Sequence, residues 1–258
     1  MTVDSPIPSF KVLGVRVHLL RMAETLQRLQ QWIGSGRDCH FVVATGMHGV
    51  IEAHKNPEFK DILNSADLFV PDGYSLVWAA RRRGHSITHR VCGTDLMWEF
   101  LAVSEKEGYG NFFYGDTEET LDRLATKLKQ EFPNLKIVGA HSPPFRPLSP
   151  TEEAQEIQII NDSEADIIWV GLGLPKQERW IYEHRDTLKV PVAVGVGAAF
   201  KFHSGQVQRA PRWIGEKGFE WLWRLIQEPK RVWKRALIDG PRFVGCVALE
   251  LSGIKKYD

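Results

Sequence analysis

The chain has 258 residues, enough for one large globular domain with an appendage, and its formal net charge is only +1. This balance excludes a polyelectrolyte that attracts anions over its whole surface, so any anion must bind where basic residues cluster locally. Three widely separated cysteines, Cys39, Cys92 and Cys246, argue against a disulfide scaffold or a zinc site and fit a reducing compartment.

The predicted elements begin with a short β element over Lys11–His18 that contains a glycine at a turn. Apolar residues at helical spacing then predict a helix from Met22 to Ile33, which ends at Gly34–Gly36. Six short apolar runs separated by helical segments follow, at 41–45, 68–72, 111–116, 136–141, 166–173 and 192–197. Runs without alternation are typical of strands covered on both faces, so this order predicts an α/β fold with a Rossmann-like, doubly wound, mostly parallel sheet.

The carboxyl ends of the runs indicate where a ligand binds, because ligands of open α/β sheets lie beyond these ends. Every run ends in polar residues or glycine, among them Thr45 and Asp72. Turn-forming residues also end many strands that have no function, but the combination favours a site of Thr45, Asp72 and glycine loops. Asp72, between Pro71 and Gly73, suits a general base. An ordinary turn aspartate or a ribose-binding carboxylate fits the same position.

A phosphate site is predicted within Gly171–Trp180, where two glycines follow a strand and Pro175 marks the start of a helix. The free amides there would contact phosphate oxygens, and Lys176 and Gln177 would extend over them. The first strand-to-helix turn, Ala44–Gly49, lacks GxGxxG, and no Walker motif occurs. Nicotinamide or flavin binding in the usual manner is therefore disfavoured.

The chain also lacks a DxD motif, the carboxylate pair with which many nucleotide-sugar enzymes hold a metal-bound diphosphate. A departing diphosphate would then be stabilised by Arg, Lys and main-chain amides, and no metal site is expected. Arg90 is one candidate for this role. Its spacing alone favours a helix cap or a surface ion pair.

The last fifth of the chain, Arg209–Arg235, combines tryptophans with a surplus of Lys and Arg. Such a mixture suits an anionic membrane surface, but it also fits the core face of a helix or a nucleic-acid surface. Pro229 is expected to end one helix and to start another. Neither a signal peptide nor a spanning helix of about 20 apolar residues is found, so any membrane contact is expected to be peripheral.

Seven motifs follow one another along the chain, at Asn64–Gly73, Val77–Ala79, Arg90–Leu96, Gly171–Ile181, Gly195–Phe200, Ser204–Trp213 and Phe219–Arg231. Together they resemble the WecG/TagA/CpsF family, glycosyltransferase family 26, from about Val12 to about Arg242. The ordered series is far more specific than any single motif.

The resemblance implies an inverting, metal-independent glycosyltransferase without a cofactor. Its donor would be a nucleotide-diphosphate sugar, expected to be UDP-linked, that carries N-acetylmannosamine or a relative, mannose or a uronic acid. The acceptor would be a polyprenyl-diphosphate-linked sugar of surface polysaccharide synthesis, at the anionic inner face of a bacterial cell membrane. No nucleic-acid partner is expected, and apolar surface around the catalytic helices is compatible with a homo-oligomer. A Rossmann-like methyltransferase or oxidoreductase, and a noncatalytic basic module for membrane or RNA, are the competing hypotheses.

The resemblance also assigns roles to residues. The proposed general base maps to Asp72, and the family's threonine, arginine and glutamine map to Thr45, Arg90 and Gln177. The donor is expected to contact Gly115, Asp116, Gly171, Gly173, Lys176, Gln177 and Lys201. A catalytic domain over residues 1–205 would be followed by a membrane-docking helical appendage over 206–258, whose Arg224, Arg231 and Lys234 face the lipid diphosphate.

Two residues depart from the family pattern. Met47 stands where the family usually has an asparagine, and Lys201 stands where it usually has an aspartate between two phenylalanines. An ammonium group in place of a carboxylate near the donor is expected to reject one sugar or base and to favour another, and an acidic sugar is one candidate.

Overall fold

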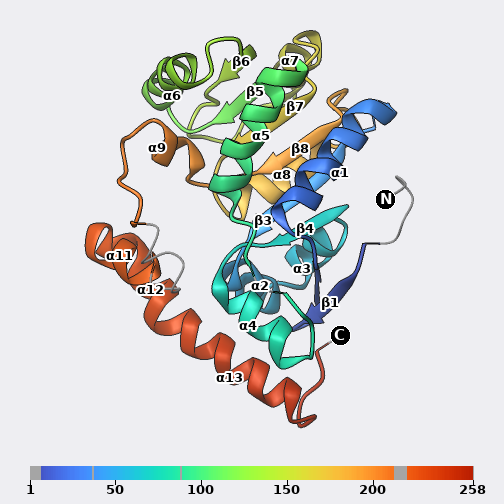
Figure 1. Cartoon of the computed structure of the whole chain (residues 1–258), viewed down its shortest axis with the longest axis vertical. Coiled ribbons are helices and arrows are strands. Elements are labelled where there is room, and N and C mark those ends of the chain that lie inside the picture. Colours follow the sequence, from blue (N-terminus) through green and yellow to red (C-terminus); the bar gives the residue numbers. More distant parts are fainter. Residues whose placement is uncertain (1–6, 37, 88, 212–219, 258) are drawn as a thin grey trace.

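The computed structural model describes residues 7–36, 38–87, 89–211 and 220–257. Its centre is a six-stranded sheet, in the order β4-β3-β8-β7-β5-β6, in which every neighbouring pair is parallel (Figure 1). The strands are β3 (His40–Thr45), β4 (Leu68–Pro71), β5 (Gly110–Gly115), β6 (Lys136–His141), β7 (Ile167–Gly171) and β8 (Val192–Gly195). All six apolar runs form strands, so the predicted doubly wound α/β fold is confirmed.

A separate antiparallel hairpin precedes this sheet. Strands β1 (Ser9–Val12) and β2 (Val15–His18) are joined by Leu13 and Gly14, which both have positive φ angles, of 50° and 79°. A two-residue turn of this kind matches the twist of the flanking strands. The predicted β element with a turn glycine is therefore a hairpin.

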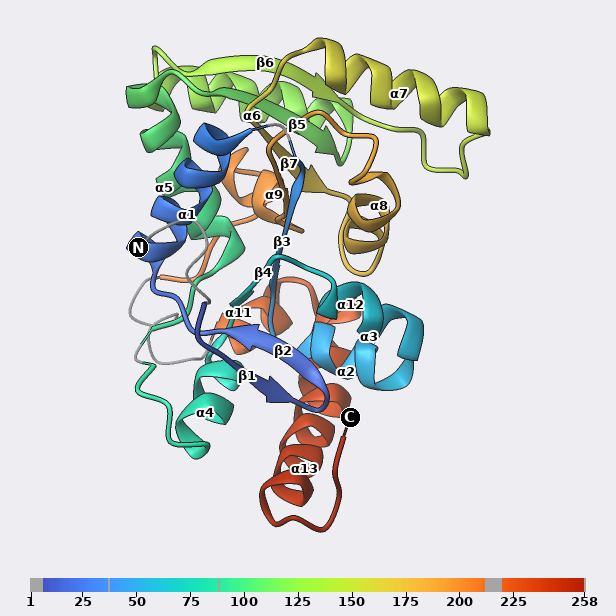
Figure 2. The ribbon, with the colours of Figure 1, turned by 90° about the vertical axis from the view of Figure 1, so that its right-hand side faces the viewer.

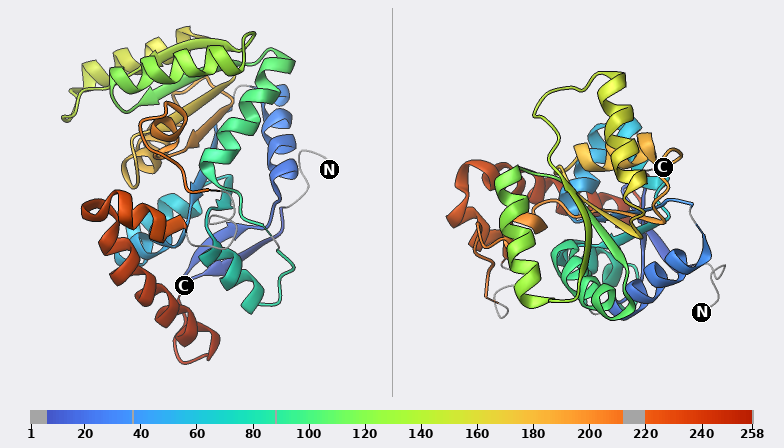
Figure 3. Two further views of the ribbon diagram at one scale, coloured as in Figure 1. Left: turned by 60° about the vertical axis from the view of Figure 1, so that its left-hand side comes forward. Right: turned by 90° about the horizontal axis from the view of Figure 1, so that it is seen from above.

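Helices cover both faces of the sheet (Figure 2 and Figure 3). One face packs against α1 (Met22–Ser35), α5 (Gly93–Glu107), α6 (Glu118–Glu131) and α9 (Ala199–His203). The other packs against α2 (Met47–Lys55), α3 (Pro57–Asn64), α4 (Tyr74–Arg82), α7 (Pro150–Asp162) and α8 (Lys176–His184). The predicted helix that ends near Gly34 is α1.

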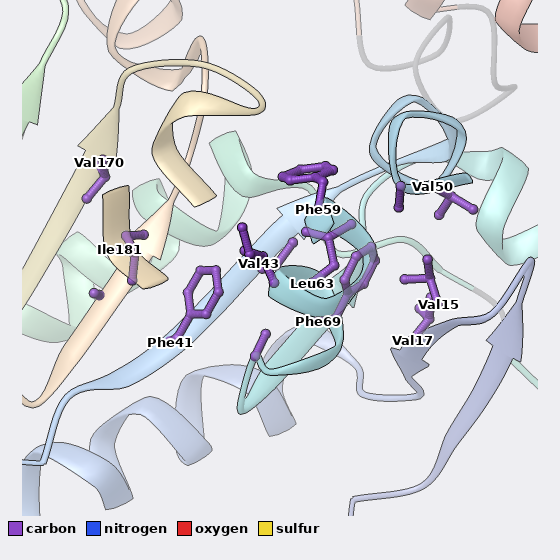
Figure 4. Packing of buried hydrophobic residues seen from close by; sticks show 14 of the residues in the cluster. Val15, Val17, Phe41, Val43, Val50, Phe59, Leu63, Phe69, Val170 and Ile181 are labelled. Atoms are coloured by element: carbon purple, nitrogen blue, oxygen red, sulfur yellow. The ribbon is translucent and has the colours of Figure 1, made fainter. Parts of the chain in front are cut away.

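Strand β3 illustrates why the runs show no alternation. Phe41 and Val43 lie in the cluster on the α2, α3 and α8 side, together with Phe69 (Figure 4). Val42 and Ala44 lie in the cluster on the opposite face. All are buried, and full burial of a large apolar side chain stabilises the fold by about 1.5–3 kcal/mol. The carboxyl ends of the strands are therefore supported by cores that pack on both faces of the sheet.

The C-terminal segment consists of α11 (Glu220–Gln227), α12 (Pro229–Lys234), the π-helix η1 (Arg235–Asp239) and α13 (Gly240–Leu251) (Figure 1). Helix α12 begins at Pro229, as predicted. Phe243 and Val247 of α13 are buried in the same cluster as Phe41, so this part of the appendage belongs to the core. In the described ranges we find no helix whose length and hydropathy would let it span a bilayer.

Candidate active site

Thr45 and Asp72 end two neighbouring strands. Thr45 pairs in register with Pro71, and the amide of Asp72 donates a hydrogen bond to the carbonyl oxygen of Thr45 at 3.3 Å. Gly46 packs so closely on this turn that a Cβ there would lie 2.2 Å from the carbonyl oxygen of Asp72. Main-chain contacts therefore hold the two predicted residues side by side.

The N-terminus of α5 completes this junction. Oδ2 of Asp72 accepts a hydrogen bond, at 3.2 Å, from the amide of Gly93, which is the first residue of α5. Amides in the first turn have no partner within their helix, and the helix dipole favours negative charge there. A half-buried carboxylate held in this way is positioned to take a proton from a hydroxyl group that approaches the edge of the sheet.

Arg90 lies on the segment that leads into α5. The amide of the next residue, Val91, donates to the carbonyl oxygen of Pro71 at 3.1 Å, so this segment runs beside the end of β4. The guanidinium carbon of Arg90 lies 5.7 Å from the centre of the Tyr74 ring, close enough for a cation–π interaction. Arg90 is thus at the same end of β4 as Asp72.

An ion pair that the sequence analysis missed joins the first turn of α5 to the segment after α9. Arg209 donates to both carboxylate oxygens of Asp95, one of them at 2.7 Å. Burial alone would raise the pKa of Asp95, but the hydrogen bonds and charge of Arg209, together with the charge of Arg90, lower this pKa overall. Arg209 therefore fixes the segment after α9 to the helix that contacts Asp72.

Glycines at the ends of β5 and β7 are required by packing. Gly115 and Gly171 pair in register, and a Cβ on Gly115 would lie 2.8 Å from the main-chain carbonyl carbon of Gly171. Gly115 also has a φ of +117°, which side chains rarely allow. A Cβ on Gly171 would lie 2.6 Å from the Phe200 ring. Close contacts thus explain both glycines without a ligand.

Asp116 and Lys201, both predicted to contact the donor, contact each other. Nζ of Lys201 lies 3.7 Å from Oδ1 of Asp116, whose side chain is 7% exposed. The same oxygen accepts hydrogen bonds from the amide of Thr117 at 3.0 Å and from the hydroxyl of Thr120 at 3.1 Å. A carboxylate in place of Lys201 would face Asp116, so the lysine replaces a like-charge contact by an attractive one.

Gln177 points into the protein, whereas it was expected to extend over a phosphate. Helix α8 begins at Lys176, after a cis peptide bond between Leu174 and Pro175. Lys176 is exposed, but Gln177 is 2% exposed. Its Oε1 accepts hydrogen bonds from the amides of Gly173 at 3.1 Å and Gly197 at 2.9 Å. Gln177 therefore joins the loops that follow β7 and β8.

The strand order separates the two halves of the predicted site. Strands β4 and β5 are four positions apart, about 19 Å at about 4.8 Å per strand. Along the line formed by the carboxyl ends of the strands, Asp72 and Thr45 lie on the β4 side, and Asp116 and Lys201 lie on the β5 side. The glycine loops of β7 and β8 lie between them. Only an extended ligand can contact both halves.

The predicted acceptor residues lie on α11 and α12. The side chains of Arg224 and Arg231 are outside the described part of the structure. Lys234, at the end of α12, is exposed, and its ammonium group lies 5.7 Å from the centre of the Trp233 ring. The roles of these three residues stay predictions.

Asp239 fixes the C-terminal segment to the helix that follows Thr45. Its Oδ1 accepts a hydrogen bond from Nζ of Lys55 at 2.9 Å, and its Oδ2 lies 3.4 Å from Nδ1 of His48. Burial, with the charge of Arg235, lowers the pKa of His48 to about 4, although Asp239 opposes this shift. The ring is therefore neutral at pH 7, and the ion pair is formed with Lys55.

Met47, which stands where the family usually has an asparagine, is also directed at the C-terminal segment. Its methyl carbon lies 3.6 Å from the position that a Cβ of Gly240 would occupy. Met47 and His48 are thus neighbours of η1 and α13. Among the described residues, no cluster of three or more His, Cys, Asp or Glu is arranged to hold a metal ion.

A parallel sheet with a carboxylate at the carboxyl ends of its strands is compatible with several enzyme classes, and comparison with known proteins distinguishes among them. A model of the "Glycosyl transferase WecG/TagA/CpsF family" matches residues 10–256. The chain belongs to this family. The match favours the glycosyltransferase interpretation over the methyltransferase, oxidoreductase and noncatalytic ones.

Three similar proteins bear the name N-acetylglucosaminyldiphosphoundecaprenol N-acetyl-beta-D-mannosaminyltransferase. One from Bacillus subtilis (strain 168) is 34% identical over 205 residues, which are 80% of this chain and 77% of the relative. One from Bacillus spizizenii (strain ATCC 23059 / NRRL B-14472 / W23) is 30% identical over 80% of this chain and 78% of its own. One from Staphylococcus aureus (strain MW2) is 27% identical over 99% of both chains.

Proposed function

We propose that the chain transfers N-acetylmannosamine from a UDP-linked donor to N-acetylglucosamine on a polyprenyl diphosphate. The names of the relatives from Bacillus and Staphylococcus support both sugars and the lipid. The observation that carries the proposal is the junction of Thr45, Asp72 and Gly93, which places a carboxylate at the carboxyl edge of the sheet.

In this reaction Asp72 accepts the proton of the acceptor hydroxyl while the oxygen of that hydroxyl attacks the anomeric carbon of the donor. The bond from that carbon to the diphosphate breaks in the same displacement, so the anomeric configuration inverts. A general base contributes about 10²–10⁴-fold in rate. Arg90 and main-chain amides stabilise the diphosphate that departs.

The order of strands supports one placement of the donor. The sugar lies near Asp72, the diphosphate lies along the loops after β8 and β7, and the nucleoside extends toward Asp116 and Lys201. Lys176 is the exposed cation at the start of α8 and contacts the diphosphate. Because Arg90 and Lys176 supply positive charge, the reaction needs no metal ion.

Exposed apolar side chains support peripheral binding of the C-terminal segment to the inner face of a bacterial membrane. They are Trp221, Leu222, Ile226, Trp233, Leu237 and Ile238. Ile226 is 73% exposed and Leu237 is 60% exposed. Burying such groups at the headgroup boundary contributes about 25 cal/mol per Å² of apolar area.

The activity test measures nucleotide release with UDP- and GDP-linked N-acetylmannosamine, mannose and uronic acids, and a short-chain polyprenyl-diphospho-N-acetylglucosamine. We expect turnover with the UDP-linked N-acetylmannosamine, the same rate in EDTA, and an inverted product by NMR. Turnover with another sugar alone would contradict the donor assignment. Loss of rate on chelation would contradict the metal-free mechanism.

The membrane test uses vesicles that contain anionic phospholipid. We expect the double variant Ile226→Asp, Leu237→Asp to sediment with vesicles at least about tenfold less than the unaltered protein, since both changes remove apolar contacts and add negative charge. Ile159→Asp is the matched control, because Ile159 is 50% exposed on α7, away from the C-terminal segment (Figure 2). Equal sedimentation of both variants would contradict the docking role.

A further inference from the structure

Behind the glycine loops lies a buried relay of hydrogen bonds that the proposed reaction does not use directly. Gln177 accepts from the amides of Gly173 and Gly197 through Oε1. Through Nε2 it donates to Oε1 of Glu178 at 2.8 Å. Glu178 is fully buried, and its Oε2 has no hydrogen-bond partner among the described residues.

The side-chain amide of Gln177 can make these hydrogen bonds in only one orientation. The two glycine amides are donors, so they require the oxygen of the Gln177 side chain and not its NH₂ group. The NH₂ group must then face an acceptor, and the carboxyl group of Glu178 offers an acceptor oxygen whether it is ionised or protonated. Glu178 therefore selects the amide orientation that keeps Gln177 bonded to both loops.

The surroundings of Glu178 isolate it from other charges. Burial raises the pKa of Glu178 to about 7, while the hydrogen bonds from Gln177 and from its own main-chain amide lower it. Of the two cations that flank Glu178 along α8, Lys176 is exposed and Arg179 pairs with Glu58 at 2.6 Å. The partner that matters to Glu178 is Gln177.

We propose that Glu178 is a positioning residue for the donor diphosphate: it orients Gln177, and Gln177 holds the loops after β7 and β8 at the spacing that the diphosphate needs. The inference rests on the proposed function, because that function places the diphosphate at these loops. Glu178 touches no substrate in this scheme. It acts only through Gln177.

Reversing the two side chains tests the relay. In Gln177→Glu, two carboxylates face each other at the 2.8 Å contact, and they remain compatible only while they share a proton. In Glu178→Gln, the native bond can form, but the side chain no longer selects the orientation of Gln177. The swap Gln177→Glu, Glu178→Gln restores one donor and one acceptor at the contact, with Glu at 177 still accepting from both glycine amides.

The readout is the affinity for uridine diphosphate at pH 6 and pH 8.5. We expect the affinity of Gln177→Glu, taken relative to that of the unaltered protein at the same pH, to fall on the order of tenfold between these values as both carboxylates ionise. We expect the swap to bind within about threefold of the unaltered protein at both pH values. If the losses of affinity of the two single variants instead added, the swap would bind more weakly than either of them. Additive losses, or a swap as weak as Gln177→Glu, would overturn the proposal.

Two further measurements keep the outcomes distinct. If Gln177→Glu does not fold, a swap that folds and binds supports the relay, whereas a swap that also fails to fold overturns it. If the unaltered protein binds no uridine diphosphate, the proposed function fails, and the relay is read from hydrogen exchange of the Gly173 and Gly197 amides. Those amides should exchange slowly in the unaltered protein and in the swap, and faster in the Glu178→Gln and Glu178→Ala variants. Equal exchange in the unaltered protein and in these two variants would overturn the proposed role of Glu178.

Discussion

Gly46→Ala tests whether the main chain sets the position of the base. The new Cβ would lie 2.2 Å from the carbonyl oxygen of Asp72, whereas real Cβ contacts are essentially never under 3.0 Å. The turn at Asp72 must therefore move by at least about 0.8 Å, and misplacement of a catalytic group by about 1 Å can reduce the rate about 10²-fold. We expect kcat/KM of Gly46→Ala to fall on the order of 10²-fold, and overpacking to lower the free energy of unfolding by about 1–3 kcal/mol.

Gly34→Ala is the matched control, because nothing lies within 4 Å of a Cβ at Gly34. This glycine is in α1, where alanine changes the free energy of unfolding by no more than about 1 kcal/mol and stabilises a helix. Steady-state transferase kinetics and urea denaturation of both variants give the comparison. A Gly46→Ala enzyme with the kcat/KM of the Gly34→Ala enzyme would refute the close packing of Gly46 against Asp72.

Two further predictions concern buried polar contacts. The ring of His18 accepts a hydrogen bond from the amide of Phe69 at 2.9 Å, and burial, with the charge of Arg16, lowers its pKa from 6.5 to about 4. The contribution of the His18 ring to the free energy of unfolding is complete above pH 6.5. About 3 kcal/mol of it is lost as the pH falls toward 4, because in this range only the unfolded chain takes up the proton. Urea denaturation of His18→Gln should show a smaller loss of stability over the same pH range, and an unchanged dependence on pH would contradict this. Asp239→Asn removes the ion pair with Lys55 and should lower the free energy of unfolding by about 1–3 kcal/mol. Hydrogen exchange in 240–251 should speed up as α13 loosens, and unchanged exchange there would show that Asp239 does not hold the segment.

Much of the sheet could be predicted because its strands are buried on both faces. The runs at 41–45 and 68–72 contain no alternation, and they form neighbouring strands whose ends bring Thr45 and Asp72 together. The carboxyl-edge rule placed these two residues together at one end of the sheet, as the structure does. It did so without any contact information, because parallel strands share one edge.

The contacts within the site could not be predicted in the same way. Gln177 was expected to extend over a phosphate, yet Ile181, one turn further along α8, is fully buried and shares a helix face with it. That spacing was the available signal for its burial. The pair of Asp116 with Lys201 joins residues 85 positions apart, and no local pattern indicates it.

The C-terminal segment was open to several interpretations because helical spacing and basic residues fit packing and membrane contact equally. Phe243 and Val247 show that packing accounts for part of it. Asp239 and the pair of Glu250 with Arg83 add polar anchors that the sequence did not reveal. The exposed apolar residues of α11, α12 and η1 are available for contact with a membrane.

The most direct test of the central claim is the single-turnover rate of Asp72→Asn with the donor and acceptor identified by nucleotide release. We predict a rate about 10²–10⁴-fold below that of the unaltered enzyme, with unchanged donor affinity, because the amide cannot accept the proton. Asp61→Asn, an exposed change on α3, should retain the full rate. An Asp72→Asn enzyme that keeps most of the rate would show that Asp72 is not the general base.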